Sequence, residues 1–346
     1  MAQFYDITDW NEKPFYNTKG TRNKCVVNNP ENNIDYYFKT SMIKEGKNYK
    51  SEFWSEVVAS EVGRFLGLNV LEYNIAKHGN DVGCISESMN TEEECLTEGI
   101  SLLTGYDNTY NPEDKSSYSA YTFQFIKSAI DSYDFDESIR DIIKTIIFDS
   151  IVGNSDRHQE NWGFITPYKP LTEVESKDLM DKLKTQIKKI KIPWKRSTEE
   201  IVAEGVDKTD VILKMEGKYA PIYDSGCCLG REKSDEAVAQ MLSDDVMFES
   251  FIDRGKSEIR WGDDGKKLNH FDLIKKIREE YKDIVDDEIN KILGLCDLNK
   301  IRDIVFNIDK ELPVELTAKF GLSLDRKKLM CKLIEKRLVR LKEVVL

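Results

Sequence analysis

Residues 151–165 read Ile-Val-Gly-Asn-Ser-Asp-Arg-His-Gln-Glu-Asn-Trp-Gly-Phe-Ile, a short polar loop between two apolar runs. Isoleucines recur at helical spacing before this loop, so we expect a buried helix over 137–152. After the loop, Trp162 and Phe164 flank a glycine and predict the start of a strand. A polar loop between two core elements is held rigidly enough to carry a site. Three of its side chains are candidates for chemistry: Asp156, His158 and Asn161.

The spacing of Asp156 and Asn161 matches the Asp-x-x-x-x-Asn pattern of kinase catalytic loops. In that pattern the aspartate accepts the proton of the attacking hydroxyl group, and the asparagine binds Mg²⁺. A second acidic residue is then expected where a strand meets a turn. Asp224 fits this place, because it follows an apolar run and precedes Gly226. Each residue alone is also typical of a local turn, but their order along the chain favours a kinase with Asn161 and Asp224 as metal ligands.

Two segments, Asn-Ser-Asp-Arg-His-Gln-Glu-Asn at 154–161 and Ile-Tyr-Asp-Ser-Gly at 222–226, resemble the motifs of the HipA-like serine/threonine protein kinases, and especially of their compact members. The phosphatidylinositol 3- and 4-kinases carry a similar first motif, so it does not separate protein from lipid substrates. The resemblance implies a bilobal, protein-kinase-like α+β fold with ATP in the cleft. We expect a β-rich N-lobe with one helix over 1–90 and a mostly helical C-lobe over 91–346.

Residues 34–40 alternate between apolar and polar side chains, so Lys39 projects from a predicted strand away from its apolar face. Kinases place there the lysine that holds the α- and β-phosphates of ATP, paired with a glutamate of the next helix. A helix predicted over 52–66 carries three candidates for that glutamate: Glu52, Glu56 and Glu61. Glu56 matches the HipA-like pattern best. Apart from the motifs above, a solvated lysine and surface glutamates would be the ordinary interpretation.

Gly20 and Thr21 lie between two segments that can pair as a hairpin. In a kinase this loop lies over the phosphates of ATP. The segment holds one glycine and no Gly-x-Gly-x-x-Gly pattern, so the residues alone favour an ordinary surface hairpin. The family resemblance is what assigns Gly20 and Thr21 to nucleotide binding.

About fifty residues separate the strand after the polar loop from Asp224, and we interpret 167–216 as a charged helical insertion. An amphipathic helix predicted over 179–191 is rich in lysine, although the chain has a net charge of −12. This helix presents either a solvated face or a docking surface for an acidic partner.

The composition narrows the class of protein. The 346 residues suffice for two lobes, and no apolar run is long enough to cross a membrane. The acidic balance argues against direct nucleic-acid binding. Seven cysteines without a Cys-x-x-Cys pair predict reduced thiols and no zinc site. With no signal peptide in evidence, we expect a cytoplasmic protein or an effector secreted without one. The first strands leave no room for the extra N-terminal subdomain of HipA-type toxins, so a DNA-binding antitoxin partner is an open question.

Together these features predict Mg-ATP-dependent transfer of the γ-phosphoryl group to a serine or threonine of a protein of unknown identity, with autophosphorylation. Asp156 would deprotonate the acceptor, and His158 would brace the loop by hydrogen bonding. Lys39, held by Glu56, would bind the phosphates, and Arg157 would contact phosphate or support the structure. Three alternatives use the same loop: a small-molecule or phosphoinositide-type lipid kinase, a kinase-fold AMP-transferase, and a pseudokinase that binds ATP without turnover.

Overall fold

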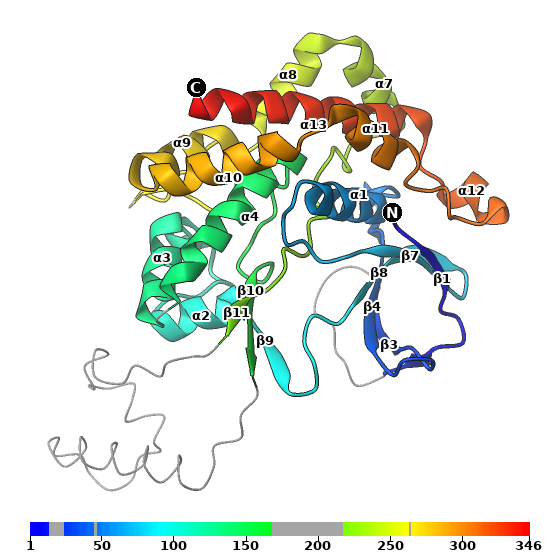
Figure 1. Ribbon diagram of the computed structural model, residues 1–346, viewed down its shortest axis with the longest axis horizontal. Coiled ribbons are helices and arrows are strands. Elements are labelled where there is room, and N and C mark those ends of the chain that lie inside the picture. Colours follow the sequence, from blue (N-terminus) through cyan, green and yellow to red (C-terminus); the bar gives the residue numbers. More distant parts are fainter. Residues whose placement is uncertain (14–23, 45–46, 134, 168–216, 263) are drawn as a thin grey trace, which may run out of the picture.

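The computed structural model describes residues 1–13, 24–44, 47–133, 135–167, 217–262 and 264–346. In Figure 1 the strands of the N-terminal part lie to one side of a helical C-terminal part, with helix α1 (Glu52–Phe65) between them. The predicted fold class, a β-rich N-lobe and a mostly helical C-lobe, is therefore confirmed. Within the described ranges, every helix is too short or too polar to cross a bilayer.

The N-terminal part is built on a six-stranded sheet with the order β1-β7-β8-β4-β3-β2. Its strands are β1 (Phe4–Asp6), β2 (Asn11–Glu12), β3 (Lys24–Asn28), β4 (Asp35–Thr40), β7 (Asn74–His78) and β8 (Asp81–Glu87). Only β1 and β7 pair in parallel; the other neighbours in this sheet are antiparallel. A short hairpin, β5 (Ile43–Lys44) and β6 (Lys47–Asn48), follows β4.

The strand alternation predicted for residues 34–40 is present in β4. Phe38 is buried on one face of the sheet, in a small core with Val27 and Ile85. Lys39 points to the opposite face, which α1 covers by packing against β4 and β8. Strand β7 begins at Asn74, and Val70 before it forms an isolated parallel bridge with Ile222.

A three-stranded sheet, β9 (Glu94–Glu98), β10 (Gly163–Pro167) and β11 (Lys218–Tyr219), begins the C-terminal part. The helices that follow β8 along the chain are α2 (Gly99–Tyr106), η1 (Lys115–Ala120), α3 (Phe123–Ser132), η2 (Asp136–Ser138), α4 (Ile139–Val152), α7 (Asp235–Ser243), α8 (Asp245–Arg254), α9 (His270–Glu280), α10 (Lys282–Leu295), α11 (Leu298–Phe306), α12 (Val314–Phe320) and α13 (Leu324–Val345). Helix α13 runs across this part and packs against α4, α7, α9, α10 and α11 (Figure 1).

Between Lys115 and Ser132 the chain forms two helices, η1 and then α3. The Thr122 hydroxyl accepts a hydrogen bond from the backbone N–H of Phe125 at 3.1 Å and so begins α3 as its N-cap. The Tyr121 hydroxyl turns inward and donates to the carbonyl oxygen of Arg157 at 3.0 Å. The break between the helices therefore supports the polar loop.

The polar loop is held at both ends. Helix α4 is buried along most of its length and ends at Gly153, whose φ of 71° lies in the left-handed region that glycine adopts readily. After the loop, β10 pairs with β9 on one side and with β11 on the other. Because β11 leads directly into residues 220–226, the same small sheet positions both the polar loop and Asp224.

Candidate active site

Lys39 forms the ion pair that its strand position predicted. Its Nζ atom lies 2.5 Å from Oε2 of Glu56 and 2.7 Å from Oδ1 of Asp224. Burial alone would lower the pKa of Lys39, but the negative charges of Asp224 and Glu56 outweigh it and hold the pKa well above its usual value. The lysine is therefore charged at neutral pH, at the point where β4, α1 and the turn after β11 meet.

The tertiary structure selects Glu56 from the three candidate glutamates. Glu52 forms an ion pair with Arg231 at 2.7 Å, and Glu61 forms one with the amino group of Met1 at 3.1 Å. Glu56, in contrast, bridges two segments, because its Oε1 accepts a hydrogen bond from the backbone N–H of Ser225 at 2.6 Å. The turn at Asp224 therefore depends on the same carboxylate that holds Lys39.

Asp224 adopts a backbone conformation that residues other than glycine seldom adopt. Its φ is +51°, in the left-handed region, which costs free energy for a residue other than glycine and is common at functional sites. The glycine that follows is required for packing, since a Cβ atom at Gly226 would lie 2.8 Å from Oε2 of Glu56. The result is a tight turn that points the Asp224 carboxylate at Lys39.

Asp156 is half-buried on the polar loop, and a cysteine holds its carboxylate. The Cys227 thiol donates to Oδ2 of Asp156 at 2.9 Å, and Arg231 donates to the same sulfur at 2.9 Å. The backbone N–H of Asp156 donates to Oδ1 of Asn154 at 3.2 Å. One carboxylate oxygen, Oδ2, is thus oriented by the segment after Asp224.

His158 and Asn161 close the polar loop. The Asn161 side-chain NH₂ donates to the carbonyl oxygen of Asp156 at 2.8 Å, and its backbone N–H donates to the carbonyl oxygen of His158 at 2.9 Å. Nδ1 of His158 accepts from the backbone N–H of Glu160 at 3.3 Å. The hydrogen bonds of His158 stay within the loop, as expected for a residue that braces it.

Arg157 joins the polar loop to the Asp224 turn. It is 1% exposed, and its guanidinium group donates to both carboxylate oxygens of Asp149 at 2.8 and 3.0 Å. It also donates to the carbonyl oxygens of Asn161 and Tyr223 and to the Ser225 hydroxyl. Burial alone would lower its pKa, but the Asp149 carboxylate raises it. Of the two roles that the sequence left open for Arg157, the contacts favour the structural one.

Two predicted site residues offer oxygen atoms to a metal ion. Because the NH₂ group of Asn161 is used by the loop, its amide oxygen is the atom left for a cation. Asp224 offers a carboxylate that is 24% exposed. One carboxylate and one amide oxygen suit Mg²⁺, which usually takes one or two carboxylates together with the phosphates of a substrate. This donor set fits the metal that the sequence predicted.

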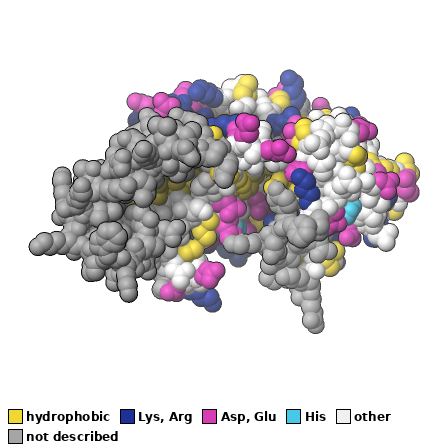
Figure 2. All heavy atoms as spheres, turned by 90° about the horizontal axis from the view of Figure 1, so that it is seen from below, with side chains coloured by type: hydrophobic (Ala, Val, Ile, Leu, Met, Phe, Trp, Pro, Cys, Tyr) yellow, Lys and Arg dark blue, Asp and Glu magenta, His cyan; other side chains and the backbone are white. Residues whose placement is uncertain are grey.

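Some predictions fall outside the described residues. These are Gly20 and Thr21 in the loop expected over ATP, the insertion predicted over 167–216 beyond β10, and its basic helix over 179–191. Figure 2 shows acidic side chains gathered near the middle of the face between the grey segments.

Sequence reasoning missed several supporting residues. Asp149, Tyr73, Cys227 and Arg231 stabilise the site, but none stands in a pattern that local spacing makes visible. Tyr73 illustrates this, because its hydroxyl accepts from the backbone N–H of Asp224 at 3.3 Å while Lys39 lies 5.2 Å from its ring centroid. The one available signal was Asp149, an acidic residue in an otherwise apolar helix, where a buried charge implies a partner.

Comparisons with known proteins agree with this geometry. No family model matches the chain. The chain is 25% identical over 301 residues to the serine/threonine-protein kinase CtkA of Helicobacter pylori, which covers 86% of this chain and 76% of that protein. The crystal structure of a Helicobacter pylori proinflammatory kinase CtkA superposes with a TM-score of 0.68 at 20% identity, over 98% of this chain and 96% of that chain.

A weaker match is the HipA–HipB–operator DNA complex of Shewanella oneidensis MR-1, with a TM-score of 0.49 at 12% identity over 98% of this chain and 67% of that chain. We draw nothing from it. The stronger matches confirm the resemblance to a serine/threonine protein kinase: the chain is similar to CtkA in sequence over most of its length and shares its fold.

Proposed function

We propose that this protein is a serine/threonine protein kinase that transfers the γ-phosphoryl group of Mg-ATP to a protein hydroxyl group and also phosphorylates itself. The observation that carries the proposal is the cluster of Lys39, Glu56 and Asp224, which brings together three segments distant in sequence. Arg157 ties this cluster to the loop that carries Asp156. Homology to a serine/threonine kinase over most of the chain supports the choice of acceptor.

Asp156 acts on the acceptor. As the acceptor oxygen forms its bond to the γ-phosphorus atom, the proton of the hydroxyl group passes to the Asp156 carboxylate. The bond between the γ-phosphorus and the β–γ bridging oxygen breaks, and ADP leaves with that oxygen. The Cys227 thiol fixes Oδ2 of Asp156, which leaves Oδ1 for the acceptor. Fixed geometry matters here because phosphoryl transfer depends mainly on positioning and charge neutralisation.

The phosphate chain of ATP is held from the other side. Lys39 is charged and close to the Asp224 turn, so it binds the α- and β-phosphates while Glu56 keeps it in place. Asn161 and Asp224 hold Mg²⁺, which neutralises charge on the phosphates when bound. The acceptor protein is unidentified.

The proposal is tested by two carboxylate variants incubated with γ-labelled ATP and a cell lysate. Asp156→Asn should lower turnover by about 10²-fold or more, the scale of losing a general base. It should keep its affinity for Mg-ATP within a few-fold in calorimetric titration, because Asp156 contacts the acceptor and not the nucleotide. Asp224→Ala should lose both turnover and the Mg²⁺-dependent part of ATP affinity.

Asp272→Asn is the matched control, since Asp272 lies exposed on α9, far along the chain from both motifs, and should keep full activity. Near-normal turnover by a folded Asp156→Asn variant would refute the assignment of the base. Label that transfers only from the α-phosphate would identify an AMP-transferase instead. Label on purified phosphoinositide, with none on protein, would identify a lipid kinase.

A further inference from the structure

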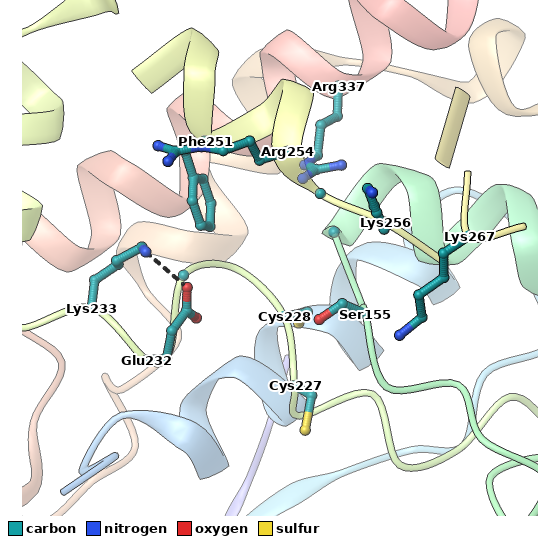
Figure 3. Close-up of a pocket in the computed structure, with 13 residues that line it drawn as sticks. Ser155, Cys227, Cys228, Glu232, Lys233, Phe251, Arg254, Lys256, Lys267 and Arg337 are labelled. Atoms are coloured by element: carbon teal, nitrogen blue, oxygen red, sulfur yellow. Dashed lines mark ion pairs between the residues drawn. The ribbon is translucent and has the colours of Figure 1, made fainter. Parts of the chain in front are cut away.

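A cavity of about 520 Å³ opens beside the polar loop, on the side away from Lys39. We call it the basic pocket. Gly153 and Ser155 form one wall of it, Cys227 and Cys228 form the floor next to them, and α8 with the segment after it forms the opposite wall. Figure 3 shows an open space between Phe251, Ser155 and Lys267. None of Lys39, Glu56 or Asp224 lines this cavity, so it is separate from the proposed phosphate-binding cluster.

The charge of the basic pocket is opposite to that of the whole chain, which is −12. One acidic side chain lines it, Glu232, and this residue pairs with Lys233 at 3.3 Å. Five basic side chains line it: Lys233, Arg254, Lys256, Lys267 and Arg337. Lys267 has a carboxylate partner, Glu258, behind the pocket wall. Such a concentration of positive charge in a concave site attracts anions.

Arg337 makes this pocket more than a set of surface lysines. Its side chain is 2% exposed and reaches the pocket from α13 (Figure 3). Its guanidinium group donates to the carbonyl oxygen of Ser150 at 3.1 Å, and within the described part of the chain it has no carboxylate partner. Burial lowers the pKa of Arg337 to about 10, so the group remains charged at neutral pH. A buried cation that lacks a counter-charge favours an anion at the pocket surface.

The basic pocket adjoins the acceptor side of the proposed reaction. Ser155, in its wall, immediately precedes Asp156, and Cys227, in its floor, donates to the Asp156 carboxylate. An extended polypeptide advances about 3.3 Å per residue. A substrate whose hydroxyl group meets Asp156 therefore places a side chain only a few residues away within the pocket.

We infer that the basic pocket binds an anionic side chain of the polypeptide substrate, a phosphorylated residue or an aspartate or glutamate, within a few residues of the acceptor hydroxyl. This inference rests on the proposed kinase function and names its substrate class as acidic or previously phosphorylated serine and threonine sites. The pocket forms charge-assisted hydrogen bonds with the anion, which are shorter and stronger than those between neutral groups.

The test uses the full chain and a series of peptides with one acceptor serine. In each peptide one position, between four residues before the acceptor and four after it, carries glutamine, glutamate or phosphoserine. At the best position, kcat/KM for the anionic peptide should exceed that for the glutamine peptide by about tenfold, mainly through KM, the scale of one charged hydrogen bond. In the double variant Lys256→Gln, Lys267→Gln this ratio should fall towards one. Added salt should also reduce it.

Lys275→Gln removes one positive charge from an exposed site on α9 and should keep the tenfold ratio. A wild-type ratio near one at every position would overturn the inference, and so would a double variant that keeps the ratio. Equal loss in Lys275→Gln would show a general charge effect and overturn it too. Binding of phosphoinositide vesicles that requires Lys256 and Lys267, together with a peptide ratio near one at every position, would identify a lipid headgroup as the occupant and overturn the inference.

A second measurement separates failure of this inference from failure of the proposed function. Fluorescence anisotropy with the Asp156→Asn variant measures binding of labelled anionic and glutamine peptides without turnover. About tenfold tighter binding of the anionic peptide, which is lost when Lys256 and Lys267 are both replaced by glutamine, supports anion binding in the basic pocket even if no phosphoryl transfer is detected. Equal binding of the two peptides overturns the inference even if the protein proves to be a kinase.

Discussion

Two buried arginines contact neighbouring residues at the C-terminal end of α4 and differ in what balances their charge. Arg157, on the polar loop, is 1% exposed and is paired with the Asp149 carboxylate. Arg337, on α13, is 2% exposed and contacts the carbonyl oxygen of the next residue, Ser150. The pKa of Arg157 is raised by its partner, whereas burial lowers the pKa of Arg337 to about 10.

The difference separates a structural arginine from one that is ready to receive a ligand. Arg157 uses its donors within the protein and fixes the polar loop against the Asp224 turn. Arg337 lies at the negative dipole end of α4 and donates to the Ser150 carbonyl oxygen, but no carboxylate among the described residues neutralises it. A fully paired buried cation supports a site rigidly, and a partly paired one at a cavity wall offers its remaining charge to an anion.

The largest expected effect on stability comes from removing Arg157, the arginine that is paired with a carboxylate. Arg157→Met removes the counter-charge of the buried Asp149 carboxylate and the donor to two carbonyl oxygens. Breaking a buried ion pair by removing one partner costs about 3–5 kcal/mol of unfolding free energy. Chemical denaturation monitored by tryptophan fluorescence measures this loss.

The matched variant is Arg337→Met, which leaves one carbonyl oxygen without its donor and should cost about 1 kcal/mol. Equal losses for the two variants would show that Arg337 is balanced as well as Arg157, and the comparison would fail. In the fluorescence anisotropy measurement, a folded Arg337→Met variant should bind the anionic peptide more weakly than wild type does.

A smaller effect should appear as a dependence of stability on pH. His270 is fully buried beside Arg337, and among the described residues neither of its ring nitrogens has a hydrogen-bond partner. Burial, followed by the positive charge of Arg337, lowers its pKa from 6.5 to about 3. Between these values the unfolded chain takes up a proton that the folded chain does not, so stability falls as pH falls below 6.5. Relative to His270→Leu, wild type should lose about 2 kcal/mol between pH 7 and pH 5.

Denaturation of both proteins at pH 7, 6 and 5 checks this expectation. Parallel curves for wild type and His270→Leu would mean that His270 titrates normally in the folded state. In an Arg337→Met background the difference should shrink, because removal of the positive charge raises the pKa of His270. That outcome would confirm that the charge of Arg337 extends to its neighbours.

The smallest expected effect on stability concerns Gly153, the glycine that ends α4. Gly153 has a φ of 71°, and an added Cβ atom would lie 2.8 Å from the guanidinium carbon of Arg337. Gly153→Ala should therefore cost on the order of 1 kcal/mol, the strain of a left-handed residue with a side chain. Gly294→Ala in α10 is the control, since its Cβ would meet nothing within 4 Å and helix propensity favours alanine. Thermal denaturation should show opposite shifts in the two variants, and shifts of the same sign would contradict this account.

The sequence alone was sufficient for features that depend on local spacing and on order along the chain. The five-residue separation of Asp156 and Asn161 and the later Asp224 predicted the kinase-like fold, which the comparisons bear out. The alternation in β4 placed Lys39 on the face that meets α1. These patterns are readable because the side-chain direction of a strand or helix follows from its own periodicity.

The tertiary structure alone decided which groups meet. Glu52, Glu56 and Glu61 are equally good helix residues; the family resemblance favoured Glu56, and the approach of β4 and the Asp224 turn is what brings Glu56 to Lys39. Arg157 reaches Tyr223, 66 residues away, and Arg337 reaches Ser150, 187 residues away. Such contacts depend on how whole elements pack, so residues far apart in the chain carry no mutual signal until the fold places them together. For the same reason the basic pocket, built from five separate segments around one cavity, is a property of the packed chain and not of any stretch of its sequence.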